Sequence, residues 1–352
     1  MTRSLDGVLK DWGDRFDYGK VKGGKGRNAR SGQTKQKTES VKNGGLATRE
    51  KFERTVKKAP EVMVKISGGG KNMRQIKAHM DYISRNGEVE IEDENGQTYL
   101  GKEDVRDVRD AWAKGKIGIP DQGEERKEAF NIVLSMPPGT NRQAVKDAAR
   151  SFAMSQFDSH QYIFAAHDDE KHPHVHLAVK AMSKDGVRLN PRKADLQQWR
   201  ELFAEKLREQ GIEANATPRK ARGIVKKPEK QAIRQIERRG GESRVKVAQR
   251  ELAEQESSGK LKYKNPATDK ILDSRKDVLT AYSEVARALA ASNVDDKRLA
   301  LDVVQFIQQF PSTSTQHEMM VHNLKQQSKS KKPELFGEKK DRPGPGEQEK
   351  SR

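Results

Sequence analysis

Residues 160–182 read HQYIFAAHDDEKHPHVHLAVKAM, and this stretch predicts two β-strands joined by a short connection. The segments YIFAAH and HVHLAVKAM are rich in apolar, aromatic and β-branched residues, which are typical of strands. The polar segment DDEKHP separates them. We therefore expect an antiparallel hairpin in this part of the chain.

Histidines concentrate in this hairpin, which holds five of the eight in the chain. Side chains alternate between the two faces of a strand, so His172, His174 and His176 share one face. The apolar residues at 175, 177 and 179 point to the other face, toward a core. His167 ends the incoming strand, where its ring can meet His174 and His176. Three converging imidazoles predict a divalent-cation site with positions left open for substrate.

Two other interpretations of these histidines stay open. They could be solvent-facing residues of an ordinary hairpin. The alternating HPHVHL also fits the histidine-triad pattern of nucleotide hydrolases, in which the central histidine attacks a phosphate. That pattern requires neither His167 nor a basic chain.

Segments on both sides of the hairpin predict an α+β domain. VMVKIS at 62–67 and FNIVLS at 130–135 predict strands, and DENG at 93–96 predicts a hairpin turn within an otherwise polar stretch. Apolar residues at helical spacing predict helices in 72–87, 141–157 and 193–211. The order strand, helix, strand, helix, hairpin, helix is typical of helices packed on a mainly antiparallel sheet.

Composition points to a polyanionic partner. The chain of 352 residues has a formal net charge of +18, and 35% of its residues are charged. Such an excess favours nucleic acid, because no stretch has the roughly 20 apolar residues of a membrane span. We expect a cytoplasmic protein without membrane insertion. Because the chain has no cysteine, any metal must be bound by His, Asp or Glu.

Charge and apolar content divide the chain into four parts. Residues 1–60 are basic and rich in Gly, Lys, Asn and Ser, so we expect a disordered arm. Residues 61–223 hold the predicted α+β domain. Residues 224–325 are charged with a helical pattern, and the tail 326–352 is too poor in apolar residues to fold.

A tyrosine in the predicted helix 72–87 is a second candidate for chemistry. If Met73, Ile76, Met80 and Ile83 face the core, Tyr82 lies on a polar flank of that helix. A tyrosine in such a place is available to react, although it could equally be a partly exposed packing residue.

The chain resembles conjugative relaxases of the MobP type, the group that includes T-DNA border endonucleases. Three motifs match in order, IKAHMDYISRNG, NIVLSMPPG and HDDEKHPHVHLAVK. The third fits the pattern H-x-D-x-x-x-x-H-x-H with His167, Asp169, His174 and His176. The resemblance covers roughly residues 61–223.

The resemblance implies an HUH-type domain with a five-stranded antiparallel sheet and the hairpin in its middle. It implies that Tyr82 nicks DNA at the transfer origin of a plasmid or mobile element, leaving a 5′-phosphotyrosyl enzyme. His167 or Asp169 would act as base or orienter beside a bound Mg or Mn ion, with Zn also compatible. DNA contacts are expected from Ser135, Arg192, Lys193, Arg219, Lys220 and Arg222.

Expected partners are single-stranded DNA, relaxosome accessory proteins and a type IV secretion coupling protein, with delivery to the recipient cell. No Walker-type motif occurs, so an unwinding helicase would be a separate protein. Unlike the family, about 60 residues precede the first predicted strand, which makes Tyr18 a rival nucleophile. Two alternatives remain: a rolling-circle replication initiator, whose tyrosine usually follows the histidine motif, and a non-catalytic basic DNA-binding accessory protein.

Overall fold

The computed structural model describes residues 4–16, 44–115, 118–119, 125–224, 229–263 and 265–330. The chain divides into two compact units. The first unit is Met1–Ile224 together with Ser274–Pro311, and the second is Val225–Asp273 together with Ser312–Arg352.

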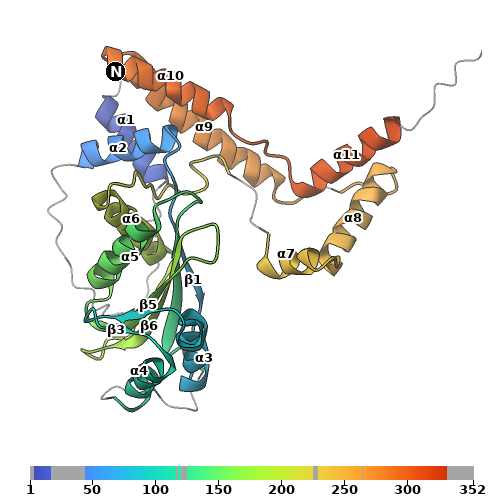
Figure 1. Cartoon of the computed structure of the whole chain (residues 1–352). Helices are drawn as coiled ribbons and strands as arrows, with labels where there is room; N and C mark the ends of the chain where they lie inside the picture. Colours follow the sequence, from blue (N-terminus) through green and yellow to red (C-terminus); the bar gives the residue numbers. More distant parts are fainter. Residues whose placement is uncertain are drawn as a thin grey trace, which may run out of the picture. The chain divides into compact units, whose positions relative to one another are not determined.

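An antiparallel sheet is the centre of the first unit (Figure 1). Its six strands within the described residues are ordered β1-β4-β6-β5-β2-β3. The predicted hairpin is β5–β6, and it lies in the middle of the sheet as expected. The sheet has six strands instead of about five because the turn predicted at 93–96 joins two very short strands. The strands are β1 (Met63–Gly68), β2 (Ile91–Asp93), β3 (Thr98–Tyr99), β4 (Ala129–Ser135), β5 (His160–His167) and β6 (His174–Ser183).

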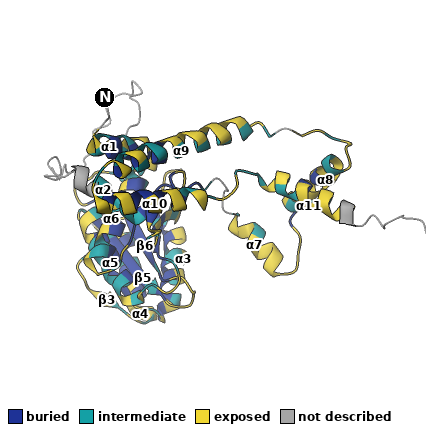
Figure 2. Cartoon of the chain, turned by 90° about the horizontal axis from the view of Figure 1, so that it is seen from above, coloured by how far each residue is buried: buried dark blue, intermediate teal, exposed yellow. Residues whose placement is uncertain are grey.

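Helices cover both faces of this sheet (Figures 1 and 2). On one face, α5 (Arg142–Gln156) and α6 (Lys193–Glu209) pack against the apolar row of β6, including Val175 and Leu177. On the other face lies α3 (Met73–Ile83), whose predicted stripe of Met73, Ile76, Met80 and Ile83 is fully buried. The architecture is therefore α+β, as predicted.

A helix that was not predicted, α4 (Lys102–Lys114), packs beside α3. Its sequence KEDVRDVRDAWAK is mostly charged, but Val105, Val108 and Trp112 lie at helical spacing and are buried. Charged residues on the solvent side conceal this narrow apolar stripe.

The prediction of a disordered arm at residues 1–60 is wrong for two segments. Residues Leu5–Phe16 form α1 and Gly44–Val56 form α2, and both pack with α9 (Thr268–Ala290) and α10 (Val294–Gln308). Trp12, Phe52 and Tyr282 meet in the centre of this four-helix group. The apolar side chains of α1 and α2 find their partners far along the chain, so local composition does not reveal them. Residues 17–43, including Tyr18, lie outside the described residues.

The continuous part of the first unit ends at Ile224, near the boundary expected at residue 223, but residues 274–311 also belong to it. Val278, Val285 and Val303 complete the core that α1 and α2 begin. Among the described residues, no helix has the length and apolar character that a membrane crossing requires.

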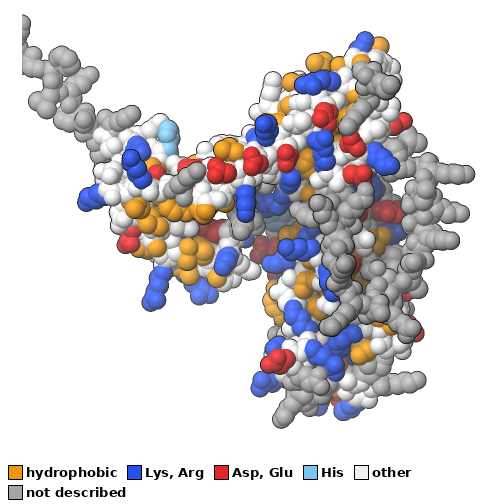
Figure 3. Space-filling model, turned by 180° about the vertical axis from the view of Figure 1, so that it is seen from behind, with side chains coloured by type: hydrophobic (Ala, Val, Ile, Leu, Met, Phe, Trp, Pro, Cys, Tyr) orange, Lys and Arg blue, Asp and Glu red, His pale blue; other side chains and the backbone are white. Residues whose placement is uncertain are grey.

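The second unit contains α7 (Gln231–Arg238), α8 (Arg244–Ser257) and α11 (Gln316–Ser330). Helix α11 continues past the expected start of the tail at 326, because KQQSKS contains good helix formers and the first proline follows at Pro333. Apolar side chains gather on the surface of this unit, among them Ile236, Val245 and Leu252 (Figure 3).

Candidate metal and nucleophile site

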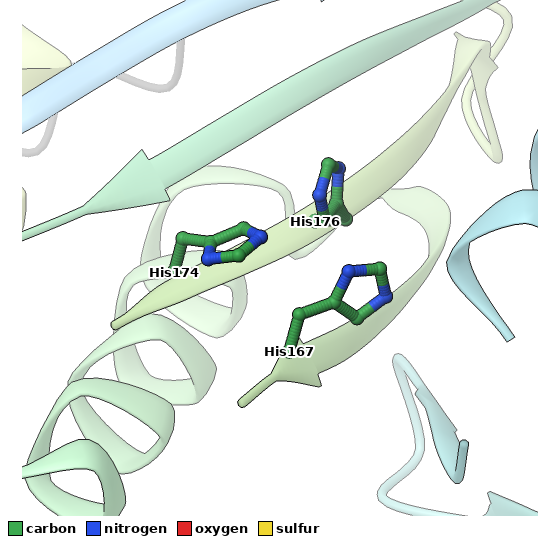
Figure 4. Close-up of side chains that lie close together, drawn as sticks. All are labelled: His167, His174 and His176. Atoms are coloured by element: carbon green, nitrogen blue, oxygen red, sulfur yellow. The ribbon is translucent and has the colours of Figure 1, made fainter. Parts of the chain in front are cut away.

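Strand pairing brings three histidines together (Figure 4). His167 on β5 is the direct cross-strand partner of His174 on β6, and His176 lies two residues further on the same face. The ring centroids are 5.4 Å apart for His167 and His174, 4.5 Å for His167 and His176, and 5.1 Å for His174 and His176. One nitrogen from each ring lies within 4.8 Å of the others. His172, by contrast, is exposed and is not part of this group.

The hydrogen bonds that the histidines donate to backbone carbonyls determine which ring nitrogens carry lone pairs. The Nε2 of His167 donates to the carbonyl of Ile83 at 2.7 Å, and the Nδ1 of His174 donates to the carbonyl of His172 at 3.0 Å. A carbonyl only accepts, so His167 Nδ1 and His174 Nε2 carry lone pairs. Both ring nitrogens of His176 are buried without a hydrogen-bond partner. A buried polar atom without a partner is costly, so the residues fit a divalent cation at this point.

Burial lowers the pKa of His79, His167 and His176 and so keeps their imidazoles neutral. His167 and His176 are only 2% and 8% exposed. Burial, together with the neighbouring histidines, lowers the pKa of His176 to about 3. Burial also lowers the pKa of His79 to about 4. Neutral imidazole is the form that binds metals, so protons compete weakly for His176 at neutral pH.

Tyr82 lies beside this histidine cluster. The buried apolar stripe of α3 sets the rotation of this helix against the sheet. Tyr82 therefore lies on the flank of α3, and half of the Tyr82 surface is exposed. Its ring centroid is 5.4 Å from that of His176 and 6.1 Å from that of His167. His79, one turn earlier on α3, stacks against it at 6.1 Å. The phenol therefore borders the candidate cation site while remaining accessible to a substrate.

Arg85 was not predicted as a site residue, yet it joins the parts of this site. It follows α3 with a left-handed backbone, φ 51°, and Asn86 continues with φ 58°. Its guanidinium carbon lies 5.1 Å from the centre of the Tyr82 ring, and its Nη2 lies 3.4 Å from His167 Nδ1. The sequence signal is the Arg-Asn-Gly segment after the tyrosine, since Asn and Gly favour left-handed backbone.

Asp169 is bound by Arg85 and not by the histidines. Burial raises the pKa of Asp169, but the nearby Arg85 and His167 outweigh that effect, so its pKa lies below the usual value. Asp169 is therefore a carboxylate that holds the guanidinium near Tyr82. Arg142 on α5 steadies the same loop, because it pairs with Asp168 and donates to the Glu170 carbonyl.

Ser135, the predicted DNA contact in the second motif, ends β4 directly opposite His174. Its side chain is 6% exposed, and its hydroxyl lies 3.4 Å from the Met136 carbonyl oxygen. The sheet therefore places this hydroxyl one strand away from the histidines.

The other predicted DNA contacts fall into two groups. Arg192 and Lys193 are exposed at the start of α6, and Arg219 and Lys220 are exposed on the segment that follows it. Arg222 is partly buried and pairs with Glu61 at 3.5 Å, so its charge is balanced inside the protein.

Comparison with known proteins identifies the domain that carries this site. Residues 82–212 match the relaxase family described as MobA/VirD2-like, nuclease domain. The match begins at Tyr82 and includes all three clustered histidines. This segment is similar to the relaxase nuclease domain.

Individual relatives of the relaxase domain agree with this family. The chain is 29% identical to the T-DNA border endonuclease VirD2 of Rhizobium radiobacter, over 48% of this chain and 44% of that protein. It is 27% identical to the protein of the same name from Rhizobium rhizogenes, over 56% of this chain and 50% of that protein. The chain thus spans about half the length of the relatives it matches.

Proposed function

We propose that this protein is a site- and strand-specific DNA relaxase that nicks the transfer origin of a plasmid or mobile element. The observation that carries the proposal is the position of Tyr82. A half-exposed phenol lies 5.4 Å, ring to ring, from the buried, unpartnered imidazole of His176. A nucleophile beside a cation site is the arrangement that phosphodiester transesterification requires.

The reaction exchanges one phosphodiester for another. The Tyr82 oxygen attacks the scissile phosphorus, the bond from phosphorus to the 3′-oxygen breaks, and the DNA end downstream stays on the protein as a 5′-phosphotyrosyl ester. The phenolic proton passes to water, to which Tyr82 is open, and the 3′-oxygen takes up a proton as it leaves. Because no bond energy is lost to hydrolysis, the reverse reaction rejoins DNA without a nucleotide cofactor.

The three imidazoles would bind a divalent cation through His167 Nδ1, His174 Nε2 and one nitrogen of His176. When bound, such a cation neutralises charge on the phosphate oxygens during attack. Nitrogen ligands suit Mn or Zn, and Mg remains a candidate because phosphate oxygens would complete its coordination. We select Mn as the first ion to test.

Arg85 and Asp169 have positioning roles in this proposal. Asp169 keeps the guanidinium of Arg85 near the Tyr82 ring, where it can donate hydrogen bonds to a phosphate oxygen. Asp169 is a poor general base, since its pKa is lowered. His167 is equally unsuited to that role, because its Nε2 donates to the Ile83 carbonyl and its Nδ1, the proposed cation ligand, lies 3.4 Å from Arg85 Nη2.

DNA would contact Ser135, Arg192, Lys193, Arg219 and Lys220. Arg222 instead anchors its segment through its ion pair with Glu61. Single-stranded DNA at the origin is the proposed substrate, and relaxosome proteins and a type IV secretion coupling protein are the proposed partners. We also propose that the protein acts in the bacterial cytoplasm and accompanies the DNA to the recipient cell.

Two alternatives are less well supported. A rolling-circle initiator usually has its tyrosine after the histidine motif, whereas Tyr82 precedes His167 in this chain. A non-catalytic accessory protein leaves the buried nitrogens of His176 unexplained.

A nicking assay tests the proposal. Supercoiled plasmid carrying the DNA that flanks this gene should be converted to open circles by the protein with Mn, and not with a chelator. Conversion that is unaffected by the chelator would contradict the role of the cation site.

A further inference from the structure

The face of the sheet that bears the histidines is only partly covered. Helix α3 lies over β5 and β6, where Tyr82 and His79 meet His176. Beyond these strands, β4 and the edge strand β1 present side chains on the same face that remain accessible. Met63 is 47% exposed, Lys65 and Ser67 are exposed, and Asn131 and Val133 are partly exposed. We call these five residues the β1–β4 strip.

Strand register joins this strip directly to the cation site. Met63 on β1 pairs with Ser135 on β4, which pairs with His174 on β6. In the next row, Lys65 pairs with Val133, which pairs with His176. Paired residues point to the same face, so two rows of side chains run from the histidines to the edge of the sheet. Neighbouring strands are about 4.8 Å apart, so β1 lies roughly 10 Å from β6.

The chemistry of the strip suits a single strand of nucleic acid. Lys65 is its one charged residue, and none of its five members is acidic. Met63 and Val133 offer apolar surface on which an unpaired base can lie, and Asn131 offers a side-chain amide. The Ser67 hydroxyl donates to the Asn131 carbonyl at 3.2 Å and can still accept a hydrogen bond. Proteins that bind single strands without reading their sequence usually combine aromatic side chains, on which bases stack, with a positively charged groove. In the β1–β4 strip the aliphatic side chains of Met63 and Val133 would take the place of the aromatic rings, and Lys65 supplies the positive charge. A lysine on an edge strand also discourages unwanted strand pairing, so a direct test is needed.

We propose that the β1–β4 strip binds the single-stranded DNA next to the scissile phosphate, with Lys65 on a backbone phosphate and Met63 against a base. This inference rests on the proposed function and names the path of its substrate. It predicts two separable contributions, one electrostatic from Lys65 and one apolar from Met63.

The test uses the full chain with Tyr82→Phe, so that binding is measured without cleavage. The probe is a fluorescent oligothymidylate of about 20 nucleotides, longer than a typical single-strand site. Anisotropy titrations at several salt concentrations compare Lys65→Ala and Met63→Ala with two matched controls. Lys184→Ala removes an exposed lysine just beyond the far end of β6, and Met154→Ala removes an exposed methionine on α5, against the opposite face.

Lys65→Ala should reduce the slope of log affinity against log salt by about 0.7, the value for one phosphate contact on a single strand. Met63→Ala should weaken binding by about fivefold, the lower limit of the range for aromatic side chains, without changing that slope. Both controls should bind like the parent. Thermal unfolding of each variant checks that the fold is retained.

Equal affinity and slope for Lys65→Ala, Met63→Ala and the controls would overturn the strip, even if the wild-type protein forms a covalent adduct with DNA. If Lys65→Ala and Met63→Ala weaken binding as expected but the wild-type protein forms no covalent adduct, the proposed function is overturned and the role of the strip in binding is retained. Stronger binding to duplex than to single strands, with unchanged binding of Met63→Ala, would also overturn the strip.

Discussion

The guanidinium of Arg85 lies over the ring of Tyr82, with 5.1 Å between the guanidinium carbon and the ring centre, and it forms an ion pair with Asp169. The position depends on two consecutive left-handed residues after α3. Such backbone conformations cost free energy and are retained where the surrounding structure requires them. The left-handed turn and the ion pair with Asp169 together hold the positive charge of Arg85 beside Tyr82.

Replacing Arg85 should slow the reaction more than it weakens binding. A preorganised charge aimed at the reacting phosphate contributes mainly to the transition state, so Arg85→Ala should reduce the rate of adduct formation about 100-fold. Arg85→Lys should retain part of the rate, because it keeps the charge but loses the planar fork. Time courses of adduct formation at saturating DNA measure this. Arg109→Ala is the control, since Arg109 pairs with Asp81 beside Tyr82 without lying over the ring. Equal rates for the Arg85 and Arg109 variants would refute the role of Arg85.

Removing one clustered histidine should abolish stabilisation by Mn. Because a ligand that binds only the folded state stabilises it, Mn at about 100 times its dissociation constant should raise the free energy of unfolding of the wild type by about 2.7 kcal/mol. His176→Ala should lose this gain, whereas His172→Ala, an exposed histidine outside the cluster, should keep it. Chemical denaturation with and without Mn is the measurement. A similar gain in both variants would place the ion elsewhere.

His160 should make the stability of the protein depend on pH. Burial lowers the pKa of His160 below its ordinary value of 6.5, an effect only partly offset by its hydrogen bond to the Lys180 carbonyl. Protonation of His160 is therefore less favourable in the folded protein than in the unfolded chain. The contribution of neutral His160 to the free energy of unfolding is fully present above pH 6.5 and is lost as the pH falls toward the pKa of His160 in the folded protein. In His160→Asn, whose amide can still donate to that carbonyl, the free energy of unfolding should decline less between pH 7 and 5. Parallel curves for the two proteins would disprove this assignment.

Trp12 should contribute strongly to stability although it lies in the basic N-terminal region. It is 3% exposed and contacts Phe16, Phe52 and Tyr282. Trp12→Ala should lower the free energy of unfolding by about 3–5 kcal/mol. Leu100→Ala, at an exposed position, should change it little. Urea denaturation distinguishes the two.

Truncation before Val62 should likewise destabilise the protein, because it uncovers Val278, Tyr282 and Val303.

The hairpin and its histidine cluster could be predicted because both depend on local patterns. Alternation in HPHVHLAVK fixes which side chains share a face, and the apolar stripe of α3 fixes the flank on which Tyr82 lies. One detail was not accessible: α3 covers the part of this face formed by β5 and β6, so His167 and His176 are buried. Burial by a distant helix is a property of packing and leaves no mark on the strand itself.

Arg85 and the four-helix group illustrate what local patterns miss. The direction of the Arg85 side chain depends on a left-handed turn, and its partner Asp169 lies on another loop. Helix α1 has apolar residues at helical spacing, among them Val8, Trp12 and Phe16, but the basic composition of residues 1–60 concealed them. Contact with α2, α9 and α10 buries this stripe. Both features depend on contacts between residues far apart in the sequence.

The central claim is that Tyr82 becomes covalently joined to the 5′ end of nicked DNA. Single-stranded oligonucleotides that tile the DNA flanking the gene, labelled at either end, are incubated with the protein and Mn and separated on a denaturing gel. The account predicts that the 3′ label moves with the protein, that the 5′ label is released, and that peptide mapping finds the nucleotide on Tyr82. Tyr82→Phe should still bind DNA but form no adduct. An adduct that persists in Tyr82→Phe, that maps to Tyr18, or that carries the 5′ label would contradict the account.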